Sequence, residues 1–281
     1  VPGGLPMEPP TDVGIPLKAG SRLVFNMHYH ATGGGPEIDD KTGLAMRWTT
    51  TAPAWISLFE LLGEPGNGDS LTPPLLIPAG EKDHVEEYTW TVSNGGSPFP
   101  DAVEARVWTI GPHMHKIATS MRVWVEDRDT AADSCLVEAP KYDYNWQRLY
   151  AYDGPLDQML RVKAGDKIHV RCVFDNTLDN PGVVEALAEV GLKDPIDVAV
   201  GEGTLDEMCI GGIGVAISVN VAQTDAPAVH EQILPVAGER SIAVIEVHLR
   251  HIQINSGQLP VLEEHVEGLA LHPVGAAIDG E

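Results

Sequence analysis

Glycine and proline interrupt this chain about every ten residues, and only short apolar runs lie between them. The 281 residues include 29 Gly and 22 Pro, and helical periodicity is scarce, with 183–190 as its best example. Runs of this length suit strands that are joined by turns. The pattern therefore predicts an all-β protein, folded as an antiparallel β-sandwich or jelly roll.

The expected strands are the apolar segments between these turns. They are 44–50, 54–62, 85–92, 103–111, 120–126, 158–163, 167–175 and 210–219. Upstream, the alternation of 21–30 predicts a further strand, and the Gly-rich and acidic stretch 33–40 predicts a linker between domains. Residues 221–281 open on a polar stretch that contains proline, and 241–254 is expected to be a strand.

The charge of the chain disfavours nucleic acid as a partner. Lys and Arg number 18 against 41 Asp and Glu, which gives a formal net charge of −23. Such a surface repels phosphate backbones, and it favours solubility and, more weakly, the attraction of metal cations. No stretch approaches the roughly 20 apolar residues of a transmembrane helix, so we expect no membrane span.

Three cysteines, Cys135, Cys172 and Cys209, cannot all pair with one another. Exported proteins form disulfides, so the natural expectation for an exported chain is one bridge and one odd thiol. We expect a secreted, periplasmic or other extracytoplasmic location, where such a bridge would be stable.

Two histidines, His113 and His115, follow the strand 103–111. Side chains two apart on an extended segment point to the same side, so both imidazoles can reach one ion. Imidazole suits copper, zinc, iron and nickel alike. Taken alone, the pair also fits two histidines of the surface or the core that bind no metal.

Met208 lies beside Cys209 in the segment 201–209. By itself a methionine here is a packing residue. A thioether is, however, a soft ligand that favours Cu(I) over zinc. Two imidazoles, a thioether and an open position would suit a copper ion that cycles through the cuprous state and binds dioxygen.

A third group of candidate ligands is the pair His28 and His30 on the expected strand 21–30. They are either edge-strand histidines or ligands of a second metal ion. The other histidines, among them His84 and His169, match no motif, and we expect them at the surface.

Five stretches, taken together and in this order, resemble the ascorbate-dependent type II copper monooxygenases. This family includes peptidylglycine α-hydroxylating monooxygenase and dopamine β-monooxygenase. The stretches are Leu23–Tyr29, which ends in His-Tyr; Ile77–Lys82, an Ile-Pro-x-Gly turn; His113–His115, a His-x-His; Gly165–Phe174, a Gly-Asp strand with a cysteine; and Gly203–Cys209, which ends in Glu-Met-Cys. The likeness covers about residues 10–220.

The resemblance implies two copper ions on two jelly-roll domains. The catalytic copper would be held by His113, His115 and Met208, and His28 would be one of three histidines at an electron-transfer copper. The resemblance also implies a Cys172–Cys209 disulfide. Residues 1–36 would be the end of the first, electron-transfer domain with its linker, 37–220 the catalytic domain, and 221–281 a C-terminal extension, partly β, outside the likeness.

Two departures from the family pattern qualify this assignment. The family completes its electron-transfer site with an adjacent His pair in the first domain, and no His-His dipeptide occurs here. We therefore expect an upstream domain to supply those ligands. The peptide hydroxylase also has an Arg for its substrate carboxylate where this chain has Gly111, which disfavours an amidating peptide hydroxylase. Cys135 has no counterpart.

The expected function is that of a copper-dependent monooxygenase. It would hydroxylate a C–H bond of a small-molecule or peptide-like substrate with dioxygen and ascorbate or a similar reductant, and this chain alone would be incomplete. The alternative is a non-catalytic copper-binding β-sandwich module. A structural zinc site is disfavoured by the thioether, because zinc prefers Cys, His and carboxylate.

Overall fold

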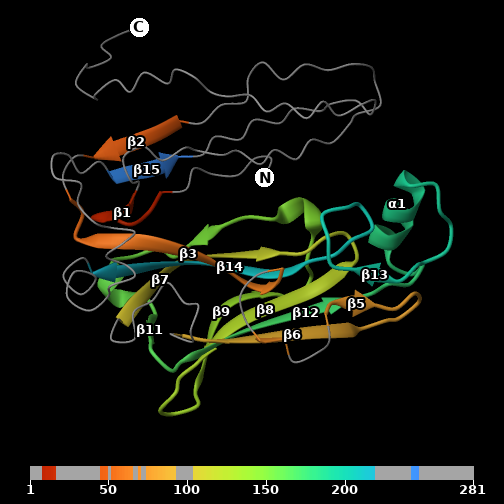
Figure 1. The fold of residues 1–281 in the computed structure, drawn as a ribbon, viewed down its shortest axis with the longest axis horizontal. Helices are drawn as coiled ribbons and strands as arrows, with labels where there is room; N and C mark the ends of the chain where they lie inside the picture. Colours follow the sequence, from red (N-terminus) through yellow and green to blue (C-terminus); the bar gives the residue numbers. More distant parts are fainter. Residues whose placement is uncertain are drawn as a thin grey trace, which may run out of the picture.

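The structure is a computed structural model that describes residues 8–16, 45–49, 52–65, 69–70, 74–92, 104–218 and 242–246. These residues fold mainly into two β-sheets that face each other, as Figure 1 shows, so the predicted all-β class is confirmed. The larger sheet has the order β10-β7-β14-β3-β1-β15-β2, with β11 also paired to β7. The smaller has the order β4-β6-β12-β8-β9.

The strands of the larger sheet are β1 Val13–Pro16, β2 Ala45–Thr49, β3 Trp55–Glu64, β7 Glu104–His113, β10 Tyr150–Ala151, β11 Arg161–Lys163, β14 Cys209–Ser218 and β15 Ile242–Glu246. Those of the smaller are β4 Asp69–Ser70, β6 His84–Thr91, β8 Ala118–Glu126, β9 Asp133–Ala139 and β12 Lys167–Phe174. A separate pair joins β5 Leu76–Ile77 to β13 Val198–Ala199. The helices are α1 Pro181–Glu189 and the 3-10 turns η1 Tyr144–Trp146 and η2 Leu156–Gln158.

The main apolar core lies between the two sheets. Leu62, Ile110 and Ile213 contribute from the larger sheet, and Val123 and Val170 from the smaller. In β12 every second residue is buried, which is the alternation of a strand with one face on a core. Pairing within the sheets is antiparallel, except that β1 runs parallel to β3. β1 comes from the segment 1–36 and β15 from 221–281, and the domain bounds given above stay a prediction.

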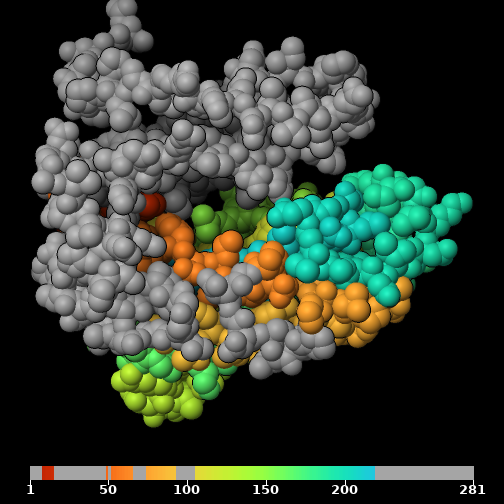
Figure 2. Space-filling model, in the orientation of Figure 1, coloured from red at the N-terminus to blue at the C-terminus, as the bar shows by residue number. Residues whose placement is uncertain are grey.

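Helix α1 packs against the segment that follows His115. Its first turn is capped by Asn180, whose side chain accepts a hydrogen bond from the Gly182 N–H, with Pro181 at the start of the helix. A Cβ on Gly182 would lie 2.0 Å from the carbonyl oxygen of Lys116, so only glycine allows this approach. In the space-filling view, α1 and the segment after it form a lobe at one end of the molecule (Figure 2).

The predicted Cys172–Cys209 bridge is confirmed, with an S–S distance of 2.04 Å, and Cys135 is free and exposed. It links β12 of the smaller sheet to the first residue of β14 in the larger sheet. The bridge therefore fastens the two layers to each other directly beside Met208. No helix among the described residues is long and apolar enough to cross a membrane.

Removal of the bridge should weaken the fold. We expect the double variant Cys172→Ala and Cys209→Ala to lose about 3 to 4 kcal/mol of unfolding free energy, since the bridge closes a loop with a sequence separation of 37. Urea unfolding measures this loss, and Cys135→Ala is the control that keeps the bridge. A double variant as stable as the control would contradict the prediction.

Candidate metal centre

The end of β7 and the start of β14 bring the three predicted copper ligands into one region. His113 is the last residue of β7 and is paired with Ile210 of β14. Met208 directly precedes β14, and His115 follows β7 by two residues. The ring centroids of His113 and His115 are 5.3 Å apart, with the planes at 87°. The two imidazoles are therefore neighbours.

One buried carboxyl group holds the backbone of this region together. Glu207 is 1% exposed. Its Oε2 accepts hydrogen bonds from the N–H groups of His115 (2.7 Å) and Met208 (3.2 Å), and its Oε1 accepts one from Ile117 (3.0 Å). Burial raises the pKa of Glu207 to about 8, although the three N–H donors act in the opposite direction. Because one oxygen binds both amides, His115 and Met208 cannot separate without breaking a buried hydrogen bond.

A backbone carbonyl fixes the tautomer of His115. Its Nδ1 lies 2.8 Å from the backbone oxygen of Asp206. A carbonyl oxygen can only accept, so Nδ1 carries the proton and donates it. In the neutral ring, Nε2 then keeps its lone pair, which is the form that binds a metal ion.

The tautomer of His113 follows from a chain of two hydrogen bonds. Gln147 donates from Nε2 to the carbonyl oxygen of Met114 at 3.2 Å, which turns its Oε1 toward the Nδ1 of His113. That oxygen accepts, so Nδ1 of His113 is the donor and Nε2 keeps its lone pair. Tyr142 braces the same carbonyl, because its hydroxyl donates to the Met114 oxygen (2.8 Å) and accepts from the Met114 N–H (2.9 Å).

The side chain of Met208 is buried, with 5% of it exposed. Within the part of the chain that the structure describes, it belongs to neither of the two apolar clusters. Its backbone is held beside that of His115, and ligation by its sulfur stays a prediction.

The predicted ligands combine two imidazoles with a thioether, and these donor types suit a copper ion. Two rings with their Nδ1 protons committed elsewhere and one thioether are a donor set that favours Cu(I). Among the described residues, no group of three or more His, Cys, Asp or Glu side chains forms a metal site. The predicted copper ligands are two histidines and Met208, so they contain only two residues of these types and do not depend on such a group. His28 and His30 lie outside the described residues.

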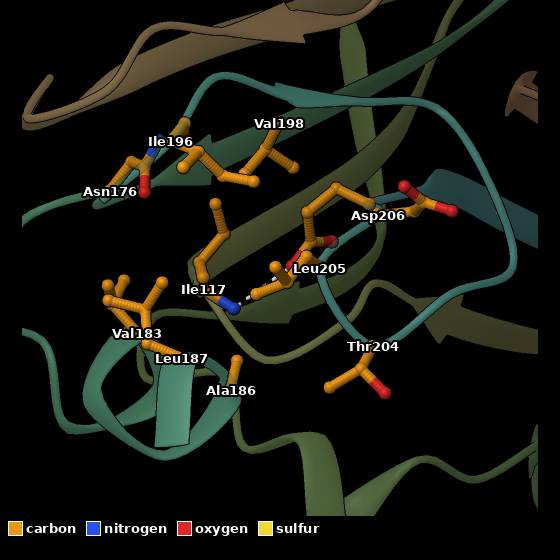
Figure 3. A pocket seen from close by; sticks show the side chains of 11 residues that line it. Ile117, Asn176, Val183, Ala186, Leu187, Ile196, Val198, Thr204, Leu205 and Asp206 are labelled. Carbon is orange, nitrogen blue, oxygen red and sulfur yellow. Dashed lines mark hydrogen bonds between the residues drawn. The ribbon is translucent and has the colours of Figure 1, made fainter. Parts of the chain in front are cut away.

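A small cavity lies behind Glu207, between α1 and the segment 196–207. Figure 3 shows Ile117, Leu187 and Leu205 among the side chains around it. Its volume of about 10 Å³ matches about one water molecule. The cavity is therefore too small to hold an organic molecule.

Three residues that shape this centre are absent from the sequence-based prediction. Glu207 lies inside the Gly203–Cys209 stretch, directly before the predicted ligand Met208. The motif therefore already contained this residue, and its place beside a ligand was the signal that could have found it. Gln147 and Tyr142 lie in a loop with no pattern that points to His113 or Met114. Only the fold brings them there.

Two other described histidines are less exposed than predicted. The side chains of His84 and His169, which we expected at the surface, are 16% and 12% exposed, so both are half-buried. Each packs beside carboxylates, and His169 also stacks on Trp124 with ring centroids 4.8 Å apart.

His84 should make the stability depend on pH. Burial lowers the pKa of His84, but hydrogen bonds to Glu86 (2.8 Å) and Glu81 (3.0 Å) raise it by more, to a net value above 6.5. Protonated His84 therefore stabilises the fold below pH 6.5, and this contribution is lost as the pH rises through the raised pKa. When the pH is raised from about 6 to about 9, the unfolding free energy of the parent protein should therefore fall by more than that of His84→Gln, which lacks the titrating imidazole. Equal losses would contradict the prediction.

A scan against protein-family models found no match, and a search of the curated proteins found none either.

Proposed function

We propose that this chain is the catalytic part of a copper-dependent monooxygenase. The copper ion would be held by His113, His115 and Met208, and the enzyme would hydroxylate a C–H bond of an organic substrate with dioxygen and an ascorbate-like reductant. The observation that carries the proposal is the pair of hydrogen bonds from which the tautomer of each imidazole is assigned. Both Nδ1 protons are committed, to Gln147 and to the Asp206 carbonyl, so both Nε2 atoms keep the lone pair that copper needs.

The fold supports the same proposal. Two facing sheets that are joined by the Cys172–Cys209 bridge suit the jelly roll that the resemblance implies, and a bridge suits a secreted or periplasmic protein. An upstream domain would add the ligands that complete an electron-transfer copper around His28.

The residues of this chain have distinct parts in the proposed reaction. Bound copper would supply the activation of dioxygen. His113 and His115 would enter that site already oriented, because Gln147 and Asp206 hold their rings. Glu207 would keep Met208 in register with His115 through its shared oxygen. A site that is arranged before the metal binds loses little conformational entropy on binding.

Copper loading of the full chain tests the donor set. We expect one copper per chain, and X-ray absorption of the Cu(I) form should show a sulfur scatterer beside two imidazoles. Met208→Leu should remove the sulfur signal, whereas Met121→Leu, which changes a buried methionine of β8, should keep it. A Cu(I) spectrum with no sulfur in the parent protein, or one that Met208→Leu leaves unchanged, would reject this donor set.

A further inference from the structure

Strand β15 comes from the C-terminal extension 221–281, which lies outside the resemblance to the copper monooxygenases. In the larger sheet it lies between β1 and β2, as Figure 1 shows. It pairs with β2 along five residues and with β1 along two, and both pairings are antiparallel. β2 is the terminal strand of the described sheet, so it is joined to the other strands through β15.

The space between β1 and β2, which we call the slot, is one strand wide. Neighbouring strands lie about 4.8 Å apart, so β1 and β2 are about 10 Å from each other. That distance is too long for hydrogen bonds between them. Each strand turns a backbone edge of N–H and C=O groups toward the slot, and such an edge is a template for a further strand. The slot therefore fits an extended segment that pairs on both of its sides.

The sequence around β15 suits such a segment. Between Gly238 and Gly257 the chain has neither Gly nor Pro, although these residues interrupt the rest of it about every ten residues. Ile242, Val244 and Ile245 are β-branched, and residues of this kind favour strands. The absence of proline also matters, because a strand with a neighbour on each side needs every backbone N–H.

We infer that the C-terminal extension is a strap, whose residues 242–246 fill the slot of the same chain and so fasten β1 and β2 to the sheet of the metal centre. The connection runs through paired strands, since β1 lies beside β3, β3 beside β14, and β14 beside β7, which ends at His113. The extension thus has a part in the fold that the resemblance does not assign.

The strap also holds the two ends of one segment of the chain. β1 ends at Pro16 and β2 begins at Ala45, so residues 17–44 leave the larger sheet on one side of β15 and return to it on the other. This segment includes His28. That its attachment affects electron transfer to the metal centre is a consequence that rests on the proposed function, whereas the strap itself does not.

Hydrogen exchange of the full chain, followed by mass spectrometry, tests the strap. Val244→Pro removes a backbone N–H in the middle of β15, and its ring disrupts the ladder. We expect the amides of 45–49 to exchange at least about tenfold faster than in the parent protein, while those of β14 stay protected. Val244→Thr keeps the N–H and the β-branched shape, so it should exchange like the parent. Equal exchange of 45–49 in Val244→Pro and the parent would overturn the inference.

A cross-link tests the same pairing in a chain without the new proline. Arg47 and Val244 are opposite each other. Opposite Cα atoms of antiparallel strands lie about 4.5 to 5.5 Å apart, a distance that a disulfide can span. With Cys135→Ala as background, Arg47→Cys with Val244→Cys should form a bridge within one chain when oxidised glutathione is added. Ala45→Cys with Ile242→Cys is the control, because these positions are four residues out of register, about 13 Å along the strands.

The outcome of the cross-link decides whether the strap exists and where it comes from. A bridge in the first pair and none in the control supports a strap within one chain. No bridge in the first pair, or equal bridging in both, would reject the pairing. A bridge between two chains would show that a second copy fills the slot, and it would overturn the strap as proposed.

Copper uptake by the same samples keeps this test separate from that of the proposed function. β15 contains none of the predicted copper ligands, so Val244→Pro should take up as much copper as the parent protein. Evidence for the strap in a chain that takes up no copper would leave the strap standing and remove the monooxygenase. Copper uptake by a parent protein whose residues 45–49 exchange as in Val244→Pro would do the reverse.

Discussion

Glu207→Ala is expected to weaken both the fold and the proposed copper site. The change leaves three buried backbone donors, those of His115, Ile117 and Met208, without their partner. Each unsatisfied donor costs about 1 to 3 kcal/mol, so the unfolding free energy should fall by at least about 3 kcal/mol. Copper affinity should fall about 10- to 100-fold, because a group that orients metal ligands is lost. Urea unfolding and chelator competition measure the two effects.

Two further variants test whether the effects belong to the Glu207 carboxyl group itself. Glu138→Ala removes an exposed carboxylate of β9 and should change neither quantity. Glu207→Gln keeps the size of the side chain but puts an amide donor where a backbone donor already points, so its effects should lie between those of the parent and Glu207→Ala. If Glu207→Ala behaves like Glu138→Ala, the carboxyl group does not hold this site.

The period of the apolar residues predicted most of the long strands. β3, β6, β7, β8, β12 and β14 all begin and end within a few residues of their expected ranges. β6, β8 and β12 bury one face on the core between the sheets, and that burial imposes their alternation. β7 and β14 are buried on both faces, so they are recognised as nearly continuous apolar runs between turns. The helix expected at 183–190 is α1.

The missed elements have physical reasons. β9 has only Leu136 buried, since it is an edge strand, and an edge strand needs little apolar alternation. β5, β10 and β13 are two residues long, too short to have a period at all. The strand expected at 158–163 begins only at Arg161, because the turn η2 occupies Leu156–Gln158.

In the candidate site, too, some features were predicted from the sequence and others were not. The ligand set and the Cys172–Cys209 pairing came from the resemblance, and the structure confirms the pairing. The hydrogen bonds that orient the ligands link residues far apart in the chain, 92 positions for His115 and Glu207 and 34 for His113 and Gln147. A local pattern carries no information on such pairs, since topology alone decides which loops meet.

Met208→His distinguishes the monooxygenase from the alternative, a non-catalytic copper-binding module. A thioether is a soft ligand that favours Cu(I), whereas imidazole binds Cu(II) at least as well. We therefore expect the variant to keep its copper and to have a lower reduction potential. The Cys172–Cys209 bridge and the hydrogen bond from the Met208 N–H to Glu207 involve no part of the methionine side chain, so the backbone there should stay in place.

Product formation by the variant then decides between the two functions. Under conditions in which the parent protein turns over, a site built for dioxygen chemistry should lose hydroxylation by at least about a hundredfold in Met208→His. A copper holder has no hydroxylation to lose, and only its affinity should change. Copper content and product are measured on the same sample of parent and variant, with Met121→Leu as the matched control. A variant with full copper and full activity would remove Met208 from the mechanism, because the soft ligand is what sets this site apart from an ordinary His-x-His metal site.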